Sequence, residues 1–279
     1  MRVLSIQSSV AAGHVGNDAA RLPLQRLGHD VLALDTVRLA HHPAHGAFRG
    51  RVTEADELAA LLDGLEAVGA LAGVDAVLTG YMGTAANGRV ALDAVARVKK
   101  RNPRALYVLD PVMGERARGF YVCEKLAAYF RDEALPRADI VLPNPFELDV
   151  LTGRHAAGLD QTRTAARTLL TQGPRLVVAK GIETDAGIGV LAVAREGAWL
   201  VETPRVAAPA HGAGDAFAAF FLGHHLKRPS PAWALGRAAS AQNALMRATA
   251  RARTGELALV SGQADWSAPR TLFRARRLR

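Results

Sequence analysis

A glycine-rich turn followed directly by an aspartate is the segment of this sequence best suited to chemistry. Gly212, Ala213, Gly214 and Asp215 stand together just before an apolar run. Two glycines let the backbone turn tightly and approach a ligand closely, and a helix that begins there points its free N–H groups at that ligand. Such a turn suits the charge of a phosphoryl group in transfer, and Asp215 could accept a proton from a hydroxyl. The same pattern also fits a plain helix start.

Two further polar segments each follow an apolar run directly. Asp110 opens the segment DPVMG, while Asn144 and Glu147 lie in NPFE. Mg²⁺ prefers oxygen ligands and needs only one or two carboxylates when phosphates supply the rest, so Asp110 and Glu147 are candidate magnesium ligands. Each segment alone is more often a helix cap, but three such segments in this order, with the glycine turn last, favour a site. No GxxxxGK[ST] sequence occurs, which excludes a Walker A loop.

The elements that must position these residues alternate between short apolar strands and longer helices. We expect strands at residues 3–7, 31–37, 76–79, 106–109, 140–142 and 176–179, and an antiparallel pair at 189–194 and 198–203. We expect helices at 19–27, 54–68, 88–100, 146–151, 162–170 and 233–247, and another after residue 212. The pattern predicts a single α/β domain with a mostly parallel central sheet and helices on both faces. Ligands bind such sheets at the carboxyl ends of the strands.

Composition favours a cytoplasmic globular protein. The chain has 279 residues, 49% of them hydrophobic, and a mean hydropathy of +0.06, which is enough apolar material for a sizeable core. A single cysteine, Cys123, excludes a disulfide framework and a zinc site built from cysteines. The apolar N-terminus is short and predicts a first strand rather than a signal peptide. No apolar run is long enough to span a bilayer, so we expect no membrane partner.

The net charge of +9 is concentrated near the C-terminus. Seven arginines against two acidic residues follow residue 250, which predicts a solvated basic tail at 251–279 and places the functional domain at 1–250. This placement argues against a nucleic-acid partner. The remaining positive excess suits a small anionic substrate.

Several motifs together resemble the ribokinase-like superfamily. They are DPVMG at 110–114, PNPFE at 143–147, AK at 179–180 and GAGDAF at 212–217. The N-terminal third is similar, within that superfamily, to the pyridoxal kinases. The segments that carry this likeness are SIQS at 5–8, GHVGN at 13–17, PLQRLG at 23–28 and GYMG at 80–83. The resemblance runs from residue 2 to about residue 250.

The resemblance implies a role for each matching position. Asp215 would be the general base for the 5′-hydroxymethyl group of a pyridine substrate, and Gly212, Ala213 and Gly214 would form the anion hole. Ser8 would hydrogen-bond the pyridine ring, with Tyr81 packed nearby. The residues implied for ATP are Asp110, Asn144 and Glu147 at the magnesium end, Lys180 at the phosphates, and Thr203, Pro204, Arg205 and Val206 at the base. ATP as co-substrate, Mg²⁺, a possible K⁺ requirement and a homodimer are implied in the same way.

The sequence departs from the pyridoxal kinase pattern around Pro43. Residues 40–43 read AHHP where relatives usually have Ser-Asn-His-Thr. Proline removes the threonine hydroxyl and the backbone donor, so we expect His42 or His45 to line the substrate pocket in compensation. His41, His42 and His45 lack the helical spacing of a metal site. The segment between Lys180 and the glycine turn is short for the family, which predicts a reduced flap over ATP.

Two alternatives remain open. One is a hydroxymethylpyrimidine or sugar kinase of the same superfamily. Pyrimidine kinases usually carry a glycine-rich first loop, whereas this chain has SSVA at residues 8–11. The other alternative is a non-catalytic protein that binds a vitamer or a nucleotide, which the intact Asp215 argues against.

Overall fold

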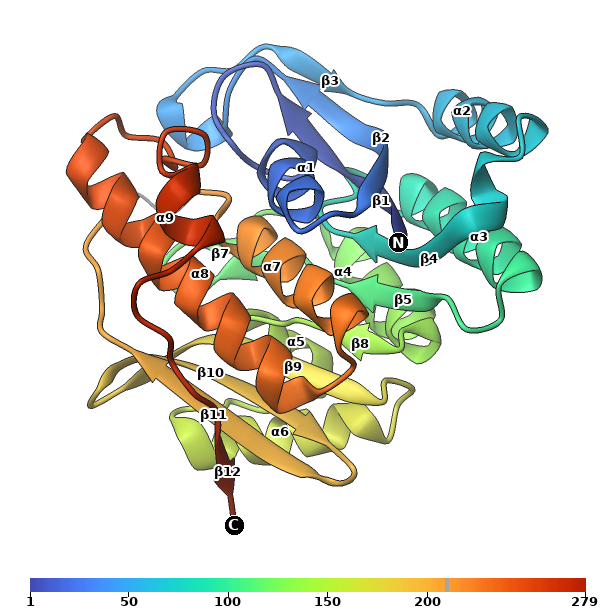
Figure 1. Ribbon diagram of the computed structural model, residues 1–279. Helices are drawn as coiled ribbons and strands as arrows, with labels where there is room; N and C mark the ends of the chain where they lie inside the picture. The colour runs from blue at the N-terminus through green and yellow to red at the C-terminus, as the bar shows by residue number, and fades with distance from the viewer. Residues whose placement is uncertain (209–210) are drawn as a thin grey trace.

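A twisted sheet of ten strands runs through the part of the chain that the computed structural model describes, residues 1–208 and 211–279 (Figure 1). The strand order is β12-β11-β10-β9-β8-β5-β4-β1-β2-β3. The six strands from β9 to β2 are parallel, and antiparallel strands extend both edges. The strands of this sheet are β1 (Arg2–Val10), β2 (Asp30–Leu39), β3 (Gly50–Val52), β4 (Val74–Thr79), β5 (Leu106–Leu109), β8 (Ile140–Val141), β9 (Leu176–Thr184), β10 (Gly187–Ala194), β11 (Gly197–Thr203) and β12 (Arg276–Leu278). A separate small hairpin joins β6 (Gly114–Glu115) to β7 (Gly119–Phe120).

Helices cover both faces of the sheet. The helices are α1 (Asn17–Arg26), α2 (Ala55–Ala67), α3 (Ala85–Arg101), α4 (Glu124–Tyr129), α5 (Pro145–Thr152), α6 (Leu159–Leu170), α7 (Ala213–Lys227), α8 (Pro231–Ala252) and α9 (Gln263–Ser267). Short 3-10 turns η1 (Pro43–His45), η2 (Ala70–Gly73) and η4 (Leu135–Arg137), and a π-helical turn η3 (Phe130–Ala134), complete the described elements.

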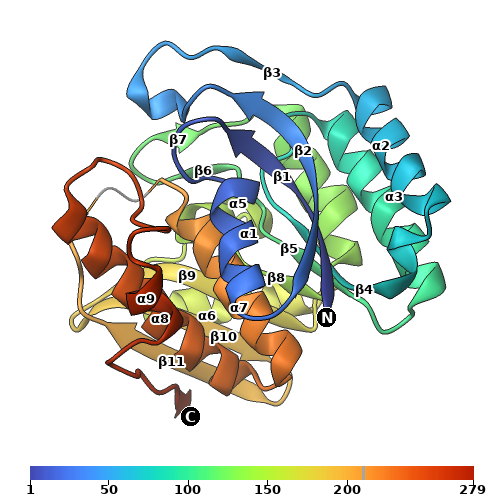
Figure 2. The ribbon, with the colours of Figure 1, turned by 45° about the horizontal axis from the view of Figure 1, so that its top comes forward.

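Each face of the sheet has its own apolar core. One core joins the sheet to helices α2 to α6, through residues such as Leu62, Val95 and Leu169. The other joins it to α1, α7, α8 and α9, which lie in front of the sheet in Figure 1 and remain together on one side after the rotation of Figure 2. A parallel sheet covered on both faces matches the expected fold class, because strands buried on both sides must be apolar throughout.

The strand and helix order predicted from the sequence is confirmed, and most predicted elements were too short. The first strand extends to Val10, and α3 starts at Ala85 because Thr84 caps it by accepting a hydrogen bond from the Asn87 backbone N–H at 3.2 Å. The sequence pattern missed β3, β6, β7, β12, α4 and α9, all six residues or fewer. Elements this short carry too few residues for a periodic pattern.

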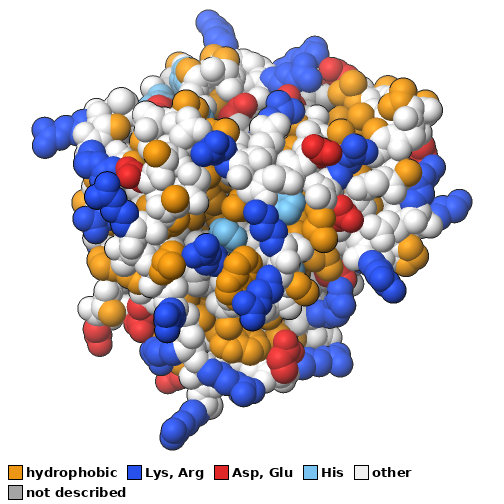
Figure 3. All heavy atoms as spheres, in the orientation of Figure 1, with side chains coloured by type: hydrophobic (Ala, Val, Ile, Leu, Met, Phe, Trp, Pro, Cys, Tyr) orange, Lys and Arg blue, Asp and Glu red, His pale blue; other side chains and the backbone are white. Residues whose placement is uncertain are grey.

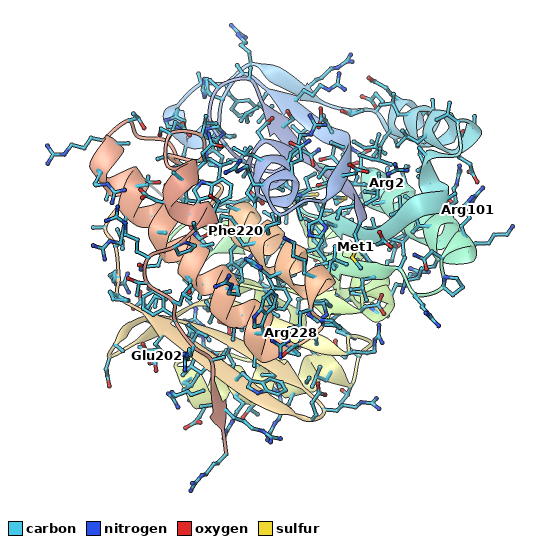
Figure 4. The ribbon with its side chains drawn as sticks, viewed as in Figure 1. Met1, Arg2, Arg101, Glu202, Phe220 and Arg228 are labelled. Atoms are coloured by element: carbon cyan, nitrogen blue, oxygen red, sulfur yellow. The ribbon has the colours of Figure 1, made fainter. Side chains whose placement is uncertain are left out.

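Residues 251–279 do not form a solvated tail. Leu257, Leu259 and Trp266 are buried, and Trp266 donates a hydrogen bond from Nε1 to the Leu259 carbonyl at 2.7 Å. Its ring lies 5.3 Å from that of Phe220, which Figure 4 labels on α7. Strand β12 then pairs with β11 at the edge of the sheet. The predicted domain boundary after residue 250 is wrong, because it falls inside α8. The prediction rested on the number of arginines in this segment and did not take its buried apolar residues into account.

The charged surface gives no sign of a single basic stripe on the face in Figure 3. Lys and Arg side chains there are spread out and separated by uncharged surface. Among the described residues, no helix combines the length and the apolar character needed to cross a membrane.

Candidate active site

The turn at Gly212 needs a glycine for two reasons. Its φ of 79° lies in the left-handed region, which side chains rarely adopt. A Cβ added there would lie 1.7 Å from the carbonyl oxygen of His14. The turn therefore packs directly against the loop at residues 11–16, and α7 begins with a hydrogen bond from the Ala216 N–H to the Gly212 carbonyl at 2.9 Å. The free N–H groups of the first turn of α7 remain available to an anion.

Asp215 stands in the first turn of α7, and the same loop holds it. Its Oδ2 accepts a hydrogen bond from the Gly16 N–H at 2.9 Å. Burial raises the pKa of Asp215, although the Gly16 hydrogen bond and the Lys180 ammonium partly oppose this. A carboxylate with a raised pKa is a better proton acceptor. Ser8 lies beside this contact, because a Cβ at Gly16 would be 2.5 Å from Ser8 Oγ.

A buried ion pair lies on the other side of the turn. Lys180 Nζ is 2.5 Å from Asp110 Oδ2, and Asp110 is fully buried. A Cβ on Gly214 would lie 3.4 Å from the same Nζ, so the ammonium group adjoins the glycine turn. Burial lowers the pKa of Lys180, but Asp110 and Glu147 outweigh that effect and leave this pKa raised. Lys180 is therefore charged and beside the place where an anion would bind.

Register shifts in the pairing of β1 and β9 occur at Ser8 and Lys180. The pairing of β9 with β10 shifts register around Lys180, next to Gly181 with a φ of 75°. The pairing of β1 with β2 shifts register between Gln7 and Ser9. Bulges of this kind redirect a side chain and are frequent near active sites.

Asn144 and Glu147 form a capping box at the start of α5. The Asn144 side chain accepts from the Glu147 N–H at 3.0 Å, and Glu147 Oε2 accepts from the Asn144 N–H at 2.7 Å. Glu147 Oε1 also accepts from the Met113 N–H at 3.2 Å, and Asn144 Nδ2 donates to the Gly114 carbonyl at 2.8 Å. The box thus ties the segment after Asp110 to α5.

The carboxylate oxygens at this end fit a magnesium ion whose other ligands are phosphate oxygens. Asp110 Oδ1 is buried and has no hydrogen-bond partner among the described residues, so one oxygen is available. Both oxygens of Glu147 already accept backbone N–H groups, which suits a contact through water better than direct ligation. Among the described residues, no group of three or more His, Cys, Asp or Glu is arranged to hold a metal ion by itself.

The remaining residues predicted for the site each contact a neighbouring element of the fold. Tyr81 follows β4, where its backbone carbonyl accepts a hydrogen bond from Thr36 Oγ1 at 2.6 Å, and burial raises the pKa of its phenol. The segment 203–206 begins at the last residue of β11 and continues as a stretch without helix or strand. Within it, Pro204 accepts a hydrogen bond from the Asn243 amide at 3.2 Å, and Arg205 pairs with Glu183 at 2.8 Å. The predicted short flap includes residues 209–210, which lie outside the described residues.

Histidines border the other end of the site. His42 stacks on His211, with ring centroids 4.2 Å apart and planes 20° apart. Burial lowers the pKa of His42 to about 4, helped by His211 and Arg118, so the ring is neutral at pH 7. His45 lies edge-on to His211 at 5.9 Å. The structure therefore places both predicted histidines beside the residue that precedes the glycine turn.

A sheet whose carboxyl edge presents a glycine turn, a raised-pKa aspartate and a buried lysine–aspartate pair is typical of small-molecule kinases with the ribokinase-like fold. The protein has that fold. Residues 51–258 match the family model described as phosphomethylpyrimidine kinase.

Relatives that match over the full length of the chain identify the family more closely. The chain is 44% identical over 283 residues to pyridoxal kinase PdxY of Rubrobacter xylanophilus, covering 100% of this chain and 98% of the relative. It is 44% identical over 286 residues to pyridoxal kinase PdxY of Deinococcus radiodurans, covering 99% and 96%. The structure of pyridoxal kinase from Leishmania donovani in complex with ADP and pyridoxine superposes with a TM-score of 0.93 at 30% identity, covering 100% and 99%. The chain belongs to the pyridoxal kinase family.

Sequence reasoning missed three contributors to this site. The Gly16 N–H lies within a quoted motif, so its position was visible although its role was not. No local pattern predicted the stack of His211 on His42, because the two residues are far apart in the sequence. Glu256 was assigned to a solvated tail, and no signal in the sequence pointed to its contact with His45, whose Nε2 lies 2.7 Å from Glu256 Oε1.

Proposed function

We propose that this protein transfers the γ-phosphoryl group of ATP to the 5′-hydroxymethyl group of pyridoxal or its vitamers pyridoxine and pyridoxamine. The observation that carries the proposal is the position of Asp215, which the Gly16 N–H holds at 2.9 Å beside the glycine turn of α7. The relatives named pyridoxal kinase, similar over their full length, support the reaction and the substrate class.

Each side chain then has a defined task. Asp215 accepts the proton of the vitamer hydroxyl, and the oxygen attacks the γ-phosphorus while ADP departs. The turn at Gly212, Ala213 and Gly214, with the N-terminus of α7, stabilises the charge on the phosphoryl oxygens. Lys180, next to Gly214, adds a fixed positive charge at the phosphates. Positioning and charge neutralisation supply most of the catalysis in phosphoryl transfer.

Asp110 is the residue proposed to hold Mg²⁺, with Glu147 reaching it through water. The supporting observation is the unpartnered, buried Asp110 Oδ1. When bound, the ion neutralises phosphate charge. Asn144 keeps these two carboxylates in place through the capping box. We propose that Thr203, Pro204, Arg205 and Val206 line the adenine base, and that Ser8 and Tyr81 contact the pyridine ring.

The test is a coupled assay of ADP release with pyridoxal, pyridoxine, pyridoxamine and hydroxymethylpyrimidine as acceptors. We expect turnover with at least one B6 vitamer, and little with the pyrimidine. A preference for hydroxymethylpyrimidine would establish instead the second candidate function, which the family model over residues 51–258 favours. Binding of vitamer and ATP without turnover would establish a non-catalytic sensor.

A homodimer, a K⁺ requirement and a cytoplasmic location complete the proposal and rest on the family resemblance. Sedimentation measures the first of these. Replacing K⁺ by Na⁺ in the same assay measures the second.

A further inference from the structure

Glu256 joins two loops that come from opposite ends of the chain. It follows α8, and its Oε1 lies 2.7 Å from His45 Nε2, with both side chains about one-third exposed. On its other side, a Cβ added at Gly13 would lie 2.7 Å from Glu256 Oε2. One carboxylate therefore contacts the histidine segment at residues 40–46 and the loop at residues 11–16.

Both of these loops border the substrate end of the site. The 11–16 loop supplies the Gly16 N–H to Asp215, and its His14 carbonyl backs the turn at Gly212. The 40–46 segment reaches the same turn through the stack of His42 on His211. Among the described residues, the contacts of the Glu256 carboxylate are with His45 and Gly13, and neither is at the end where Lys180 pairs with Asp110.

The histidine segment has little else to hold its tip. Its base is tied to the neighbouring loop by the hydrogen bond from the Ala12 N–H to the Ala40 carbonyl at 2.9 Å. The turn η1 at its tip buries no side chain. A segment without buried apolar contacts opens readily, so the contacts of His42 and His45 decide its position.

We propose that Glu256 is a positioning residue for the vitamer: through His45 and the Gly13 backbone it keeps the 40–46 segment closed over the substrate end of the site. The inference rests on the proposed function, because it assigns the pyridine substrate to that end. Under this proposal, the segment at residues 251–279, which the charge pattern predicted to be a separate tail, contributes to substrate affinity. Arg118 of the β6–β7 hairpin lies near His42 and His211, and Glu115 lies near His211. Glu256 links His45 to the segment that follows α8.

The variant Glu256→Ala should raise the Michaelis constant for the best vitamer about tenfold, the size expected for one lost hydrogen bond to a charged group. The constant for ATP and the turnover number should stay within about twofold, because the ATP end is untouched. Glu256→Gln keeps an acceptor oxygen for His45 and should restore most of the affinity. A general loss of stability would not produce this split or this rescue.

His45→Ala and the double variant with Glu256→Ala complete a cycle. If the two residues act through each other, the double variant should be no worse than the poorer single variant. Arg251→Ala is the matched control, because it removes the Arg251–Asp265 ion pair of the same C-terminal segment without touching the site. It should leave both Michaelis constants unchanged.

Hydrogen exchange separates this inference from the proposed function. In the absence of any substrate, Glu256→Ala should speed exchange at residues 40–46, and Arg251→Ala should not. If the wild-type enzyme phosphorylates no vitamer, the proposed function fails while exchange still tests the anchoring. If the wild-type enzyme is active but Glu256→Ala alters neither exchange nor the vitamer constant, or raises both Michaelis constants equally, the positioning role is overturned.

Discussion

Asp215 and its neighbours show how much of the chemistry depends on single contacts. The carboxylate lies in the first turn of α7, but the donor that orients it, the Gly16 N–H, is 199 residues away in the sequence. Lys180 and Asp110, 70 residues apart, form the charged pair next to it. The role of each side chain can be tested by a substitution of nearly equal size.

Asp215→Asn should keep the fold and the hydrogen bond from Gly16, because the amide oxygen can replace the carboxylate oxygen as acceptor. Without a positioned base, turnover should fall by about 10²–10⁴-fold, while ATP binding, measured by titration, should be retained. Turnover near that of the wild type would remove Asp215 from the role of base.

The same residue should set the acid limb of the pH profile. Only the carboxylate can accept the proton, so kcat/KM should rise as pH increases through the pKa of Asp215. Since burial raises that pKa, the limb should lie above the ordinary aspartate value of about 3.9. The residual activity of Asp215→Asn, measured across the same pH range, should lack this limb; an unchanged limb would assign it to another group.

Lys180→Met tests the charged pair. Removing the ammonium leaves Asp110 buried without its partner, which typically costs about 3–5 kcal/mol of unfolding free energy. The Michaelis constant for ATP should rise, and vitamer affinity should change little. Adding Asp110→Asn should recover part of the stability in denaturant unfolding, because the unpaired charge is gone. Additive losses would mean that the two residues do not act as a pair.

At the scale of elements, the contact between the turn before α7 and the loop at residues 11–16 is what assembles the site. Gly212 combines a left-handed backbone with a close approach to the His14 carbonyl. Gly28 offers a natural comparison: its φ is 82°, but a Cβ added there meets nothing within 4 Å.

Gly212→Ala should therefore lower turnover strongly, because the added Cβ forces the turn away from the 11–16 loop and with it the Gly16 contact to Asp215. Gly28→Ala should cost about 1 kcal/mol of stability from backbone strain alone and leave kinetics unchanged. Kinetic assays and denaturant unfolding of both variants measure the difference. Equal effects of the two variants on turnover would show that strain, and not the loop contact, matters.

At the scale of the whole molecule, the C-terminal segment completes the helical layer on one face of the sheet. Trp266 is buried between Phe220 of α7 and the Leu259 carbonyl. Strand β12 adds the last strand, where Arg276 pairs at 3.2 Å with Glu202 of β11, the residue labelled in Figure 4. A segment with these contacts contributes to global stability.

Trp266→Ala should reduce the free energy of unfolding by about 3–5 kcal/mol, the usual cost of removing a large buried aromatic side chain. Leu272→Ala is the control in the same segment, because Leu272 is 54% exposed and surface substitutions usually stay within about 0.5 kcal/mol. Urea unfolding compares the two. If Trp266→Ala lowers the free energy of unfolding no more than Leu272→Ala does, the segment is a solvated tail after all.

The sequence by itself determined the features that depend on neighbouring residues. Alternating apolar strands and helices predicted the α/β class, because burial of a parallel sheet on both faces requires continuous apolar runs. The glycine turn before Asp215 was visible in the sequence because its residues are adjacent. The possible capping role of Asn144 and Glu147 was visible too, since a capping box spans only four residues.

Only the tertiary structure decided which distant groups meet. The Lys180–Asp110 pair, the stack of His42 on His211 and the contact of Glu256 with His45 each join segments that strand order and loop packing bring together. Local patterns carry no information on such contacts, because side-chain distances across a fold follow from register and packing rather than from adjacent residue types. Charge counting failed at residues 251–279 for this reason: burial is a property of the assembled layers.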